Sequence, residues 1–147
     1  MKRAAITGAV LWFLNSAQAQ TPEFINPDGL TKPTTYTQIV KTGKLLFIAG
    51  QTAVTADGKI VGPGMKEQVD QVLTNLEIAL KSQGANFNHV VKITTYVTNM
   101  AEFRAPDVMR LRSERFQGRV PASTLVEVSG LANPAYKVEI EAIAVLP

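Results

Sequence analysis

The chain has 147 residues, of which 46% are hydrophobic and 18% charged, with a formal net charge of +3, one histidine and no cysteine. A chain of this length accommodates one domain. The lack of cysteine excludes a disulfide-stapled scaffold, and one histidine leaves too few ligands for the usual zinc or iron sites, so we expect no metal.

The first 19 residues have the pattern of a secretory signal peptide. Lys2 and Arg3 form a basic start, residues 4–14 are an apolar segment, and residues 17–19 match the small-x-small cleavage pattern. The apolar segment has about half of the roughly 20 residues that span a bilayer, which argues against an anchor helix. We therefore expect a periplasmic or secreted protein with no membrane contact after cleavage.

Cleavage also changes the charge. Without Lys2 and Arg3, 13 basic residues stand against 12 acidic ones, a net charge of about +1. Nucleic-acid-binding domains carry a basic field, and a single local group of arginines is all that resembles one here. Its members are Arg104, Arg110, Arg112, Arg115 and Arg119. We therefore expect no nucleic-acid partner.

The mature chain begins with an arm and then a hairpin. Residues 20–34 are rich in Pro, Thr and Asn and predict an arm with little regular structure, followed by the domain at residues 35–147. Residues 36–41 and 45–49 are β-rich, and residues 42–44 between them form a Gly-containing turn, so we predict a β-hairpin.

The next elements are a turn and a helix. Asp57-Gly58 predicts a tight turn that returns Ile60 and Val61 as a short edge strand. Between Gly64 and Gly84, apolar residues recur at the spacing of one helix face, which needs an apolar partner such as a sheet. These residues are Val69, Val72, Leu73, Leu76, Ala79 and Leu80.

The second half of the chain adds three strands and one helix. Residues 90–98 are a β-branched run, Pro106 opens a helix that extends to about Gln117, and strands follow at residues 121–131 and 137–146. Two helices and about six strands predict a two-layer α+β domain. In the last strand both alternating series end in apolar residues, so we expect other subunits to cover the back of the sheet.

Few residues carry obvious chemistry. Glu139 and Glu141 are two positions apart on one strand, so their carboxylates would lie on one face about 7 Å apart. Such a pair can hold a water and raise one pKa, although a salt-bridged or solvated rim explains it equally well. Ser123 has no evident base, since the single histidine, His89, follows the Gly84 cap, where a surface or capping role fits better.

Several stretches between Tyr36 and Val145 form a joint pattern. They are Tyr36-Thr-Gln, Phe47-Ile-Ala-Gly-Gln51, Asp57-Gly58, a helix with Gln71, Val72, Asn75 and Leu76, Val91-Lys-Ile-Thr-Thr-Tyr-Val97, and Val138-Glu-Ile-Glu-Ala-Ile-Ala144. In this pattern the chain resembles the Rid/YjgF family, the reactive-intermediate deaminases also called L-PSP or UK114. The resemblance implies a chorismate-mutase-like α+β fold, with a mixed sheet of about six strands and two helices on one face. It further implies a homotrimer whose sheets form a central barrel, with small-molecule clefts at the subunit interfaces.

Active members of this family hydrolyse enamine and imine intermediates, such as 2-aminoacrylate, to a 2-oxo acid and ammonia without a metal or cofactor. The resemblance implies that Glu139 is the catalytic glutamate that helps to place the attacking water. It also implies that Tyr36 is the cleft tyrosine and that Gly50 and Gln51 form the loop beside the cleft.

The chain departs from the family at one position. Pro121-Ala122-Ser123 stands where the family has Pro-Ala-Arg, whose arginine holds the substrate carboxylate. A serine offers one neutral donor in place of a bidentate cation, so we expect roughly 10- to 100-fold poorer capture of an anionic substrate.

Three explanations stay open. Arg104 or Arg119 could reach the cleft and support a working 2-iminobutanoate/2-iminopropanoate-type deaminase. The cleft could instead take a neutral or differently charged ligand, with Ser123 and Thr124 as hydrogen-bond donors, or the fold could persist as a trimeric binding module. We favour the last two together, an exported metabolite-binding protein with at most altered deaminase activity. Ribonuclease activity, a further alternative, fits the near-neutral mature charge poorly.

Overall fold

A computed structural model describes residues 20–147, so the predicted signal peptide lies outside the described residues. The elements follow in chain order. They are strands β1 (Glu23–Ile25), β2 (Ile39–Thr42) and β3 (Leu45–Gln51), helix α1 (Met65–Ser82), the 3-10 helix η1 (Phe87–His89), strand β4 (Val90–Val97), helices α2 (Met100–Phe103) and α3 (Pro106–Arg115), and strands β5 (Ala122–Glu127) and β6 (Val138–Val145).

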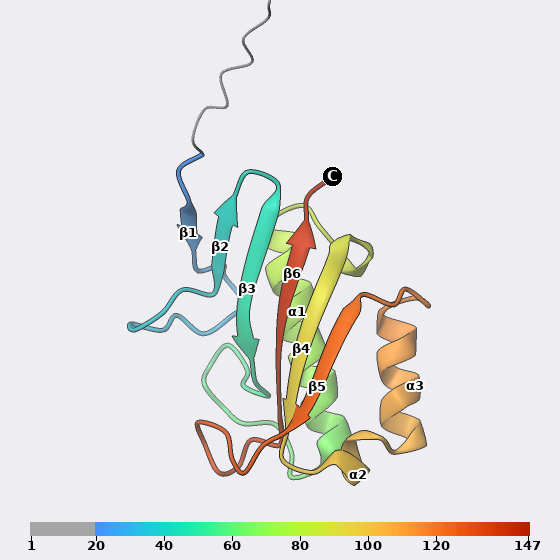
Figure 1. The fold of residues 1–147 in the computed structure, drawn as a ribbon. Coiled ribbons are helices and arrows are strands. Elements are labelled where there is room, and N and C mark those ends of the chain that lie inside the picture. The colour runs from blue at the N-terminus through green and yellow to red at the C-terminus, as the bar shows by residue number, and fades with distance from the viewer. Residues whose placement is uncertain (1–19) are drawn as a thin grey trace, which may run out of the picture.

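The six strands form one mixed sheet in the order β1-β2-β3-β6-β4-β5. β4 and β5 are parallel, and all other neighbouring strands are antiparallel. Helix α1 covers one face of the sheet behind β3, β6 and β4, and α3 lies at the β5 edge and packs against α1 (Figure 1). The predicted α+β fold, a six-stranded mixed sheet with its helices on one face, is confirmed.

The core lies between α1 and the sheet. The predicted apolar stripe of the helix faces inward, and each fully buried Val or Leu of this kind stabilises the fold by about 1.5–3 kcal/mol. Its buried members are Val69, Val72, Leu73, Leu76, Ala79 and Leu80. Asn75 is buried beside them and donates hydrogen bonds to the carbonyl oxygens of Thr52 (3.0 Å) and Val54 (2.8 Å), which ties the segment after β3 to the helix.

Alternation along the strands gives the sheet two different faces. In β6 the buried residues point toward α1, and the residues between them lie on the opposite side, which we call the open face. Neighbouring strands add their own alternate residues to it. The open face comprises Leu45, Phe47, Lys92, Thr94, Tyr96, Glu139, Glu141, Ile143 and Val145. Leu45, Phe47 and Val145 are exposed there, as the apolar ending of the strand predicts. Its coverage by other subunits stays a prediction.

The N-terminal segments differ in detail from the prediction. The arm, predicted to have little regular structure, contributes the three-residue strand β1, which pairs with β2. Strand β2 begins at Ile39 rather than at residue 36. The carbonyl oxygen of Gln38 still accepts the N–H of Ala49 in β3 (2.9 Å), but its own N–H donates to Asn26 Oδ1 (2.9 Å) and its side chain donates to Thr31, so the chain before Ile39 turns toward the arm.

Three further differences concern short elements. The predicted strand at Ile60 and Val61 is a single bridge between Val54 and Ile60. Helix α2 was not predicted, although Asn99 caps it by accepting a hydrogen bond from the N–H of Glu102 (3.0 Å). Helix α3 ends at Arg115, since Gln117 has a positive φ of 50° that continues no helix. His89 has the predicted capping role, because its Nδ1 accepts the N–H of Asn86 (3.1 Å).

Candidate functional site

Glu139 lies on the open face near the start of β6, directly opposite Tyr96 of β4. On its other side, β3 carries a bulge between Ile48 and Gln51, which brings Gly50 against the Glu139 side chain. A Cβ atom at Gly50 would overlap the Glu139 carboxylate, with Cδ only 2.8 Å away. A glycine at position 50 therefore leaves the space that the carboxylate occupies.

The surroundings of Glu139 favour its protonated form more than water does. Burial raises the pKa of this carboxyl above its usual 4.5, and the nearby charge of Glu141 raises it further. The pKa of the Tyr36 phenol is also raised. Burial is the larger cause, and the charge of Glu139 is the second. Tyr36, Gly50, Glu139 and Glu141 thus form one cluster within a single chain, which we call the Glu139 cluster.

Gln51 follows Gly50 in sequence, but its side chain points into the core. It is 3% exposed, and its Nε2 donates to Gln38 Oε1 (2.8 Å) and to the carbonyl oxygen of Ala49 (2.9 Å). Both amide hydrogens are therefore used internally. The buried Gln51 side chain therefore supports the β3 bulge. Only the main chain of Gln51 is left to contact a ligand.

Ser123 and Thr124 lie on opposite faces of β5. Thr124 pairs with Thr94 on the open face, and its Oγ1 accepts a hydrogen bond from Lys92 Nζ (2.6 Å). Ser123 pairs with the buried Ile93 and lies on the helix face, where it lines a cavity beneath α3. Within one chain, the two hydroxyls therefore do not converge on one ligand.

Ser123 is also well separated from the Glu139 cluster. It is level with Ile93 and Ala142 in the sheet, whereas Glu139 is level with Tyr96, three residues farther along. Two strand spacings and three residues amount to roughly 14 Å in the plane of the sheet, and the two side chains leave opposite faces. A site that uses both positions consequently needs two copies of the chain.

The cavity beside Ser123 has a volume of about 260 Å³ and is bounded by β5, α3 and the connection between them. Arg112 and Arg119 both line it, while Arg104 does not and instead caps the C-terminus of α2. Arg119 was one of the two arginines expected near this site, and Arg112 was not foreseen. Its position four residues after the buried Val108 places it on the inward face of α3, a spacing visible in the sequence.

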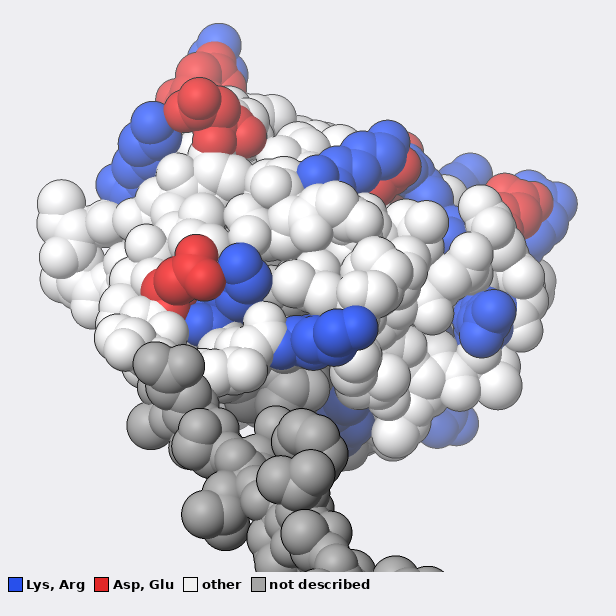
Figure 2. All heavy atoms as spheres, turned by 90° about the horizontal axis from the view of Figure 1, so that it is seen from above, with Lys and Arg blue, Asp and Glu red and all other residues white. Residues whose placement is uncertain are grey.

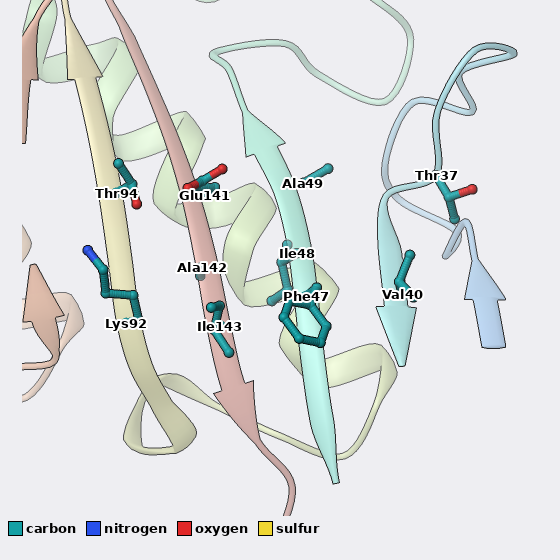
Figure 3. A pocket seen from close by; sticks show the side chains of 10 residues that line it. All are labelled: Thr37, Val40, Phe47, Ile48, Ala49, Lys92, Thr94, Glu141, Ala142 and Ile143. Carbon is teal, nitrogen blue, oxygen red and sulfur yellow. The ribbon is translucent and has the colours of Figure 1, made fainter. Parts of the chain in front are cut away.

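A second hollow lies on the open face and has a volume of about 410 Å³. Figure 3 shows its side chains, which come from β2, β3, β6 and β4 and the segment before β2. Phe47, Val40 and Ile143 make one part apolar, and Lys92, Thr94 and Glu141 make the other part polar. Glu141 lines this hollow and Glu139 does not, so the hollow reaches one edge of the Glu139 cluster without including Glu139 itself.

Charge is dispersed on the side of the molecule drawn in Figure 2. Lys and Arg side chains form separate groups there, several of them beside Asp or Glu, and no continuous basic field joins them. Within residues 20–147, no group of three His, Asp or Glu side chains is placed to hold a metal ion. Over the same range, every helix is too short or too polar to cross a membrane.

Known proteins resemble this chain in sequence and in fold. Residues 29–146 match the family described as Endoribonuclease L-PSP. A 2-iminobutanoate/2-iminopropanoate deaminase from Mus musculus is 37% identical over 111 residues, which cover 75% of this chain and 80% of the mouse protein. A RutC family protein from Pyrococcus horikoshii is 39% identical over 110 residues, 74% of this chain and 85% of that protein. The crystal structure of a Rid family protein from Yersinia pestis has a TM-score of 0.79 and 29% identity and covers 86% of this chain and 100% of that one. The chain therefore belongs to the Rid/YjgF/L-PSP family.

Proposed function

We propose that the protein binds small imine or enamine acids in clefts between copies of the chain. We propose further that it hydrolyses them to a 2-oxo acid and ammonia at Glu139. The observation that carries this proposal is the Glu139 cluster: a half-buried carboxyl whose pKa is raised, set against Gly50 and beside Tyr36. The mouse relative, named a 2-iminobutanoate/2-iminopropanoate deaminase, supports the choice of substrate class.

The reaction needs a group that both takes up and returns a proton. Water adds to the imine carbon and one of its protons passes to the nitrogen, which gives a carbinolamine. The carbinolamine hydroxyl then gives up its proton to the nitrogen as the C=O bond forms, the C–N bond breaks and ammonia leaves. A carboxyl whose pKa is raised is a stronger base than an ordinary glutamate and can return the proton that it takes up, so it is suited to both transfers. Glu139 would accept the proton from water and return it to nitrogen, and the Tyr36 phenol, which stays protonated, would offer a hydrogen bond.

The test measures ammonia release from 2-aminoacrylate or 2-iminobutanoate generated in situ. We expect turnover in the wild type at a lower rate than in relatives that keep the Pro-Ala-Arg arginine, and a loss of at least about 100-fold in Glu139→Gln. Glu114→Gln, at an exposed carboxylate paired with Arg110, is the matched control and should keep wild-type turnover. Equal activity in Glu139→Gln and the wild type would contradict the proposal.

A binding module without turnover is the second candidate, and Ser123 favours it. The family arginine is absent from this position, so the capture of an acid through it is lost. This candidate predicts that the wild type binds a neutral or differently charged small molecule and releases no ammonia above the uncatalysed rate. Metabolite binding with wild-type turnover that depends on Glu139 would exclude it.

Ribonuclease activity, which the family name Endoribonuclease L-PSP suggests, has less support. Proteins that act on RNA engage phosphates through clustered Lys and Arg side chains. The dispersed charge in Figure 2 and the net charge of about +1 for residues 20–147 offer no such surface on that side. RNA binding that weakens steeply as salt increases would overturn this assessment.

A further inference from the structure

We propose that Arg112, assisted by Arg119, forms the carboxylate-binding site of this protein in the cavity beside Ser123. The family arginine would thus be replaced by a cation from helix α3. This inference rests on the proposed function, because it names how the same site recognises the acid group of its substrate. Four observations support it.

The first observation is that the cavity holds positive charge and no negative charge. Arg112 and Arg119 are its charged lining residues, and no Asp or Glu lines it. Ser113 and Ser123 add hydroxyl groups, and the remaining walls are largely apolar. With a volume of about 260 Å³, the cavity has room for several water-sized groups, enough for a small organic acid.

The second observation is that Arg112 lacks an anionic partner. Among residues 20–147, no ion pair includes it, and its Nε is buried without a hydrogen-bond acceptor. Its one hydrogen bond goes from Nη1 to the sulfur of Met109 at 3.6 Å, and sulfur is a weak acceptor. The guanidinium carbon lies 4.7 Å from the centre of the Phe103 ring, which fixes its position. A partly buried cation in this state is costly, and a bound carboxylate would compensate it.

The third observation comes from the other arginines of α3. Arg115 contacts the carboxylates of Asp70 and Glu77, and Arg110 pairs with Glu114. Their charges are therefore balanced within the chain. Arg112 is the arginine of this helix that is turned inward and left without a carboxylate, as expected if an anion arrives from outside.

The fourth observation concerns position 123 itself. Ser123 and Arg112 line the same cavity, so an arginine at position 123 would add a third cation beside Arg112 and Arg119. Three neighbouring positive charges repel one another, and this cost grows as water is excluded. A small neutral side chain at position 123 leaves space in the cavity for an anion, which Arg112 can then bind. Ser123 then makes room for Arg112 to act as the anion-binding residue, and the protein keeps its ability to bind a carboxylate.

The experiment measures pyruvate binding by amide chemical-shift titration, with methyl pyruvate as the uncharged probe. We expect wild-type protein to bind pyruvate and to bind methyl pyruvate about 10- to 100-fold more weakly, the range for losing charged hydrogen bonds. Arg112→Gln should weaken pyruvate binding by a similar factor and leave methyl pyruvate unchanged. The matched control is Arg110→Gln, on the same helix but outside the cavity, which should behave like the wild type.

A reciprocal variant separates anion binding from a structural role of Arg112. In Arg112→Gln, the added change Ser123→Arg should restore pyruvate binding to within a few-fold of the wild type, because it returns one guanidinium to the cavity. Arg112→Lys, which keeps the charge but not the bidentate geometry, should fall between the wild type and Arg112→Gln. Pyruvate affinity that is the same in Arg112→Gln and in the wild type would overturn the inference, and so would equal affinities for pyruvate and methyl pyruvate.

The two proposals fail in different ways. Pyruvate binding that depends on Arg112, without any ammonia release, would refute the hydrolase and keep the inference. Turnover that depends on Glu139, with pyruvate affinity and KM unaffected by Arg112→Gln, would keep the hydrolase and refute the inference.

Discussion

Replacing Gly50 with alanine tests the position of the Glu139 carboxyl without touching its chemistry. The added Cβ would lie 2.8 Å from Glu139 Cδ, and ordinary contact begins at 3.4 Å, so the carboxyl carbon must move by at least 0.6 Å. Displacements of about 1 Å in a catalytic group can cost on the order of 100-fold in rate. We therefore expect kcat for ammonia release to fall about 10- to 100-fold in Gly50→Ala.

Stability should change little in the same variant. The atoms that give way are the end of one side chain, and the backbone at Gly50 is not in the left-handed region, so alanine meets no φ strain there. We expect the free energy of unfolding in urea to change by less than about 1 kcal/mol. Gly130→Ala is the matched control, since a Cβ there meets nothing within 4 Å. Wild-type turnover in Gly50→Ala, combined with an inactive Glu139→Gln, would refute the position assigned to the carboxyl.

Three further predictions concern the same region. Gln51→Leu should lower the free energy of unfolding in urea by about 1–3 kcal/mol, because it leaves the buried Gln38 Oε1 without its donor; an unchanged midpoint would contradict this. Glu141→Gln should shift the acid limb of the pH–rate profile to lower pH, because removing this charge lowers the pKa of Glu139; an unmoved limb would exclude the coupling. Glu139→Gln should become more stable relative to the wild type as pH rises from about 4 to 8. The folded-state pKa of Glu139 lies above its unfolded value, so the stability that the protonated carboxyl contributes at low pH is lost as pH rises through the folded-state pKa. A constant difference between urea midpoints at the two pH values would be inconsistent with a raised pKa.

Periodicity and turn residues predicted most of the helices and strands, whereas the order of the strands in the sheet was not predicted from them. The stripe from Val69 to Leu80 predicted α1 because its burial follows from spacing along one helix. The start of β2 was harder to predict, since the N–H of Gln38 donates to Asn26 and its side chain donates to Thr31, which turns the chain before Ile39 toward the arm. The pattern of neighbouring residues in the sequence does not predict a hydrogen bond to a residue 12 positions away.

The candidate site was also predicted only in part from the sequence. Glu139 and Glu141 were expected on one face from strand alternation, and the structure places both there. Ser123 and Thr124 were expected to act together, yet adjacent residues of a strand point to opposite faces, so the same alternation separates them. Arg112 was missed because its importance comes from what it lacks, a carboxylate partner, and partners are set by packing between α3 and its neighbours.

The separation of the two halves of the site gives a prediction about assembly. Ser123 and its cavity lie on the helix face of one chain, and Glu139 lies roughly 14 Å away on the open face, so one chain cannot bring an acid bound at Arg112 to its own Glu139. In a ring of identical copies, each cleft would combine Arg112 of one copy with Glu139 of the next. Arg112→Gln and Glu139→Gln should each be inactive alone under conditions of low substrate. Unfolded together in equal amounts and refolded, they should recover about a quarter of wild-type activity, because each of the two positions in a cleft is intact with a chance of about one half. Gel filtration and ammonia release would be measured on the same mixed sample. If oligomers form and the mixture stays as inactive as its components, both groups do not act in one cleft between copies, and the composite site is wrong.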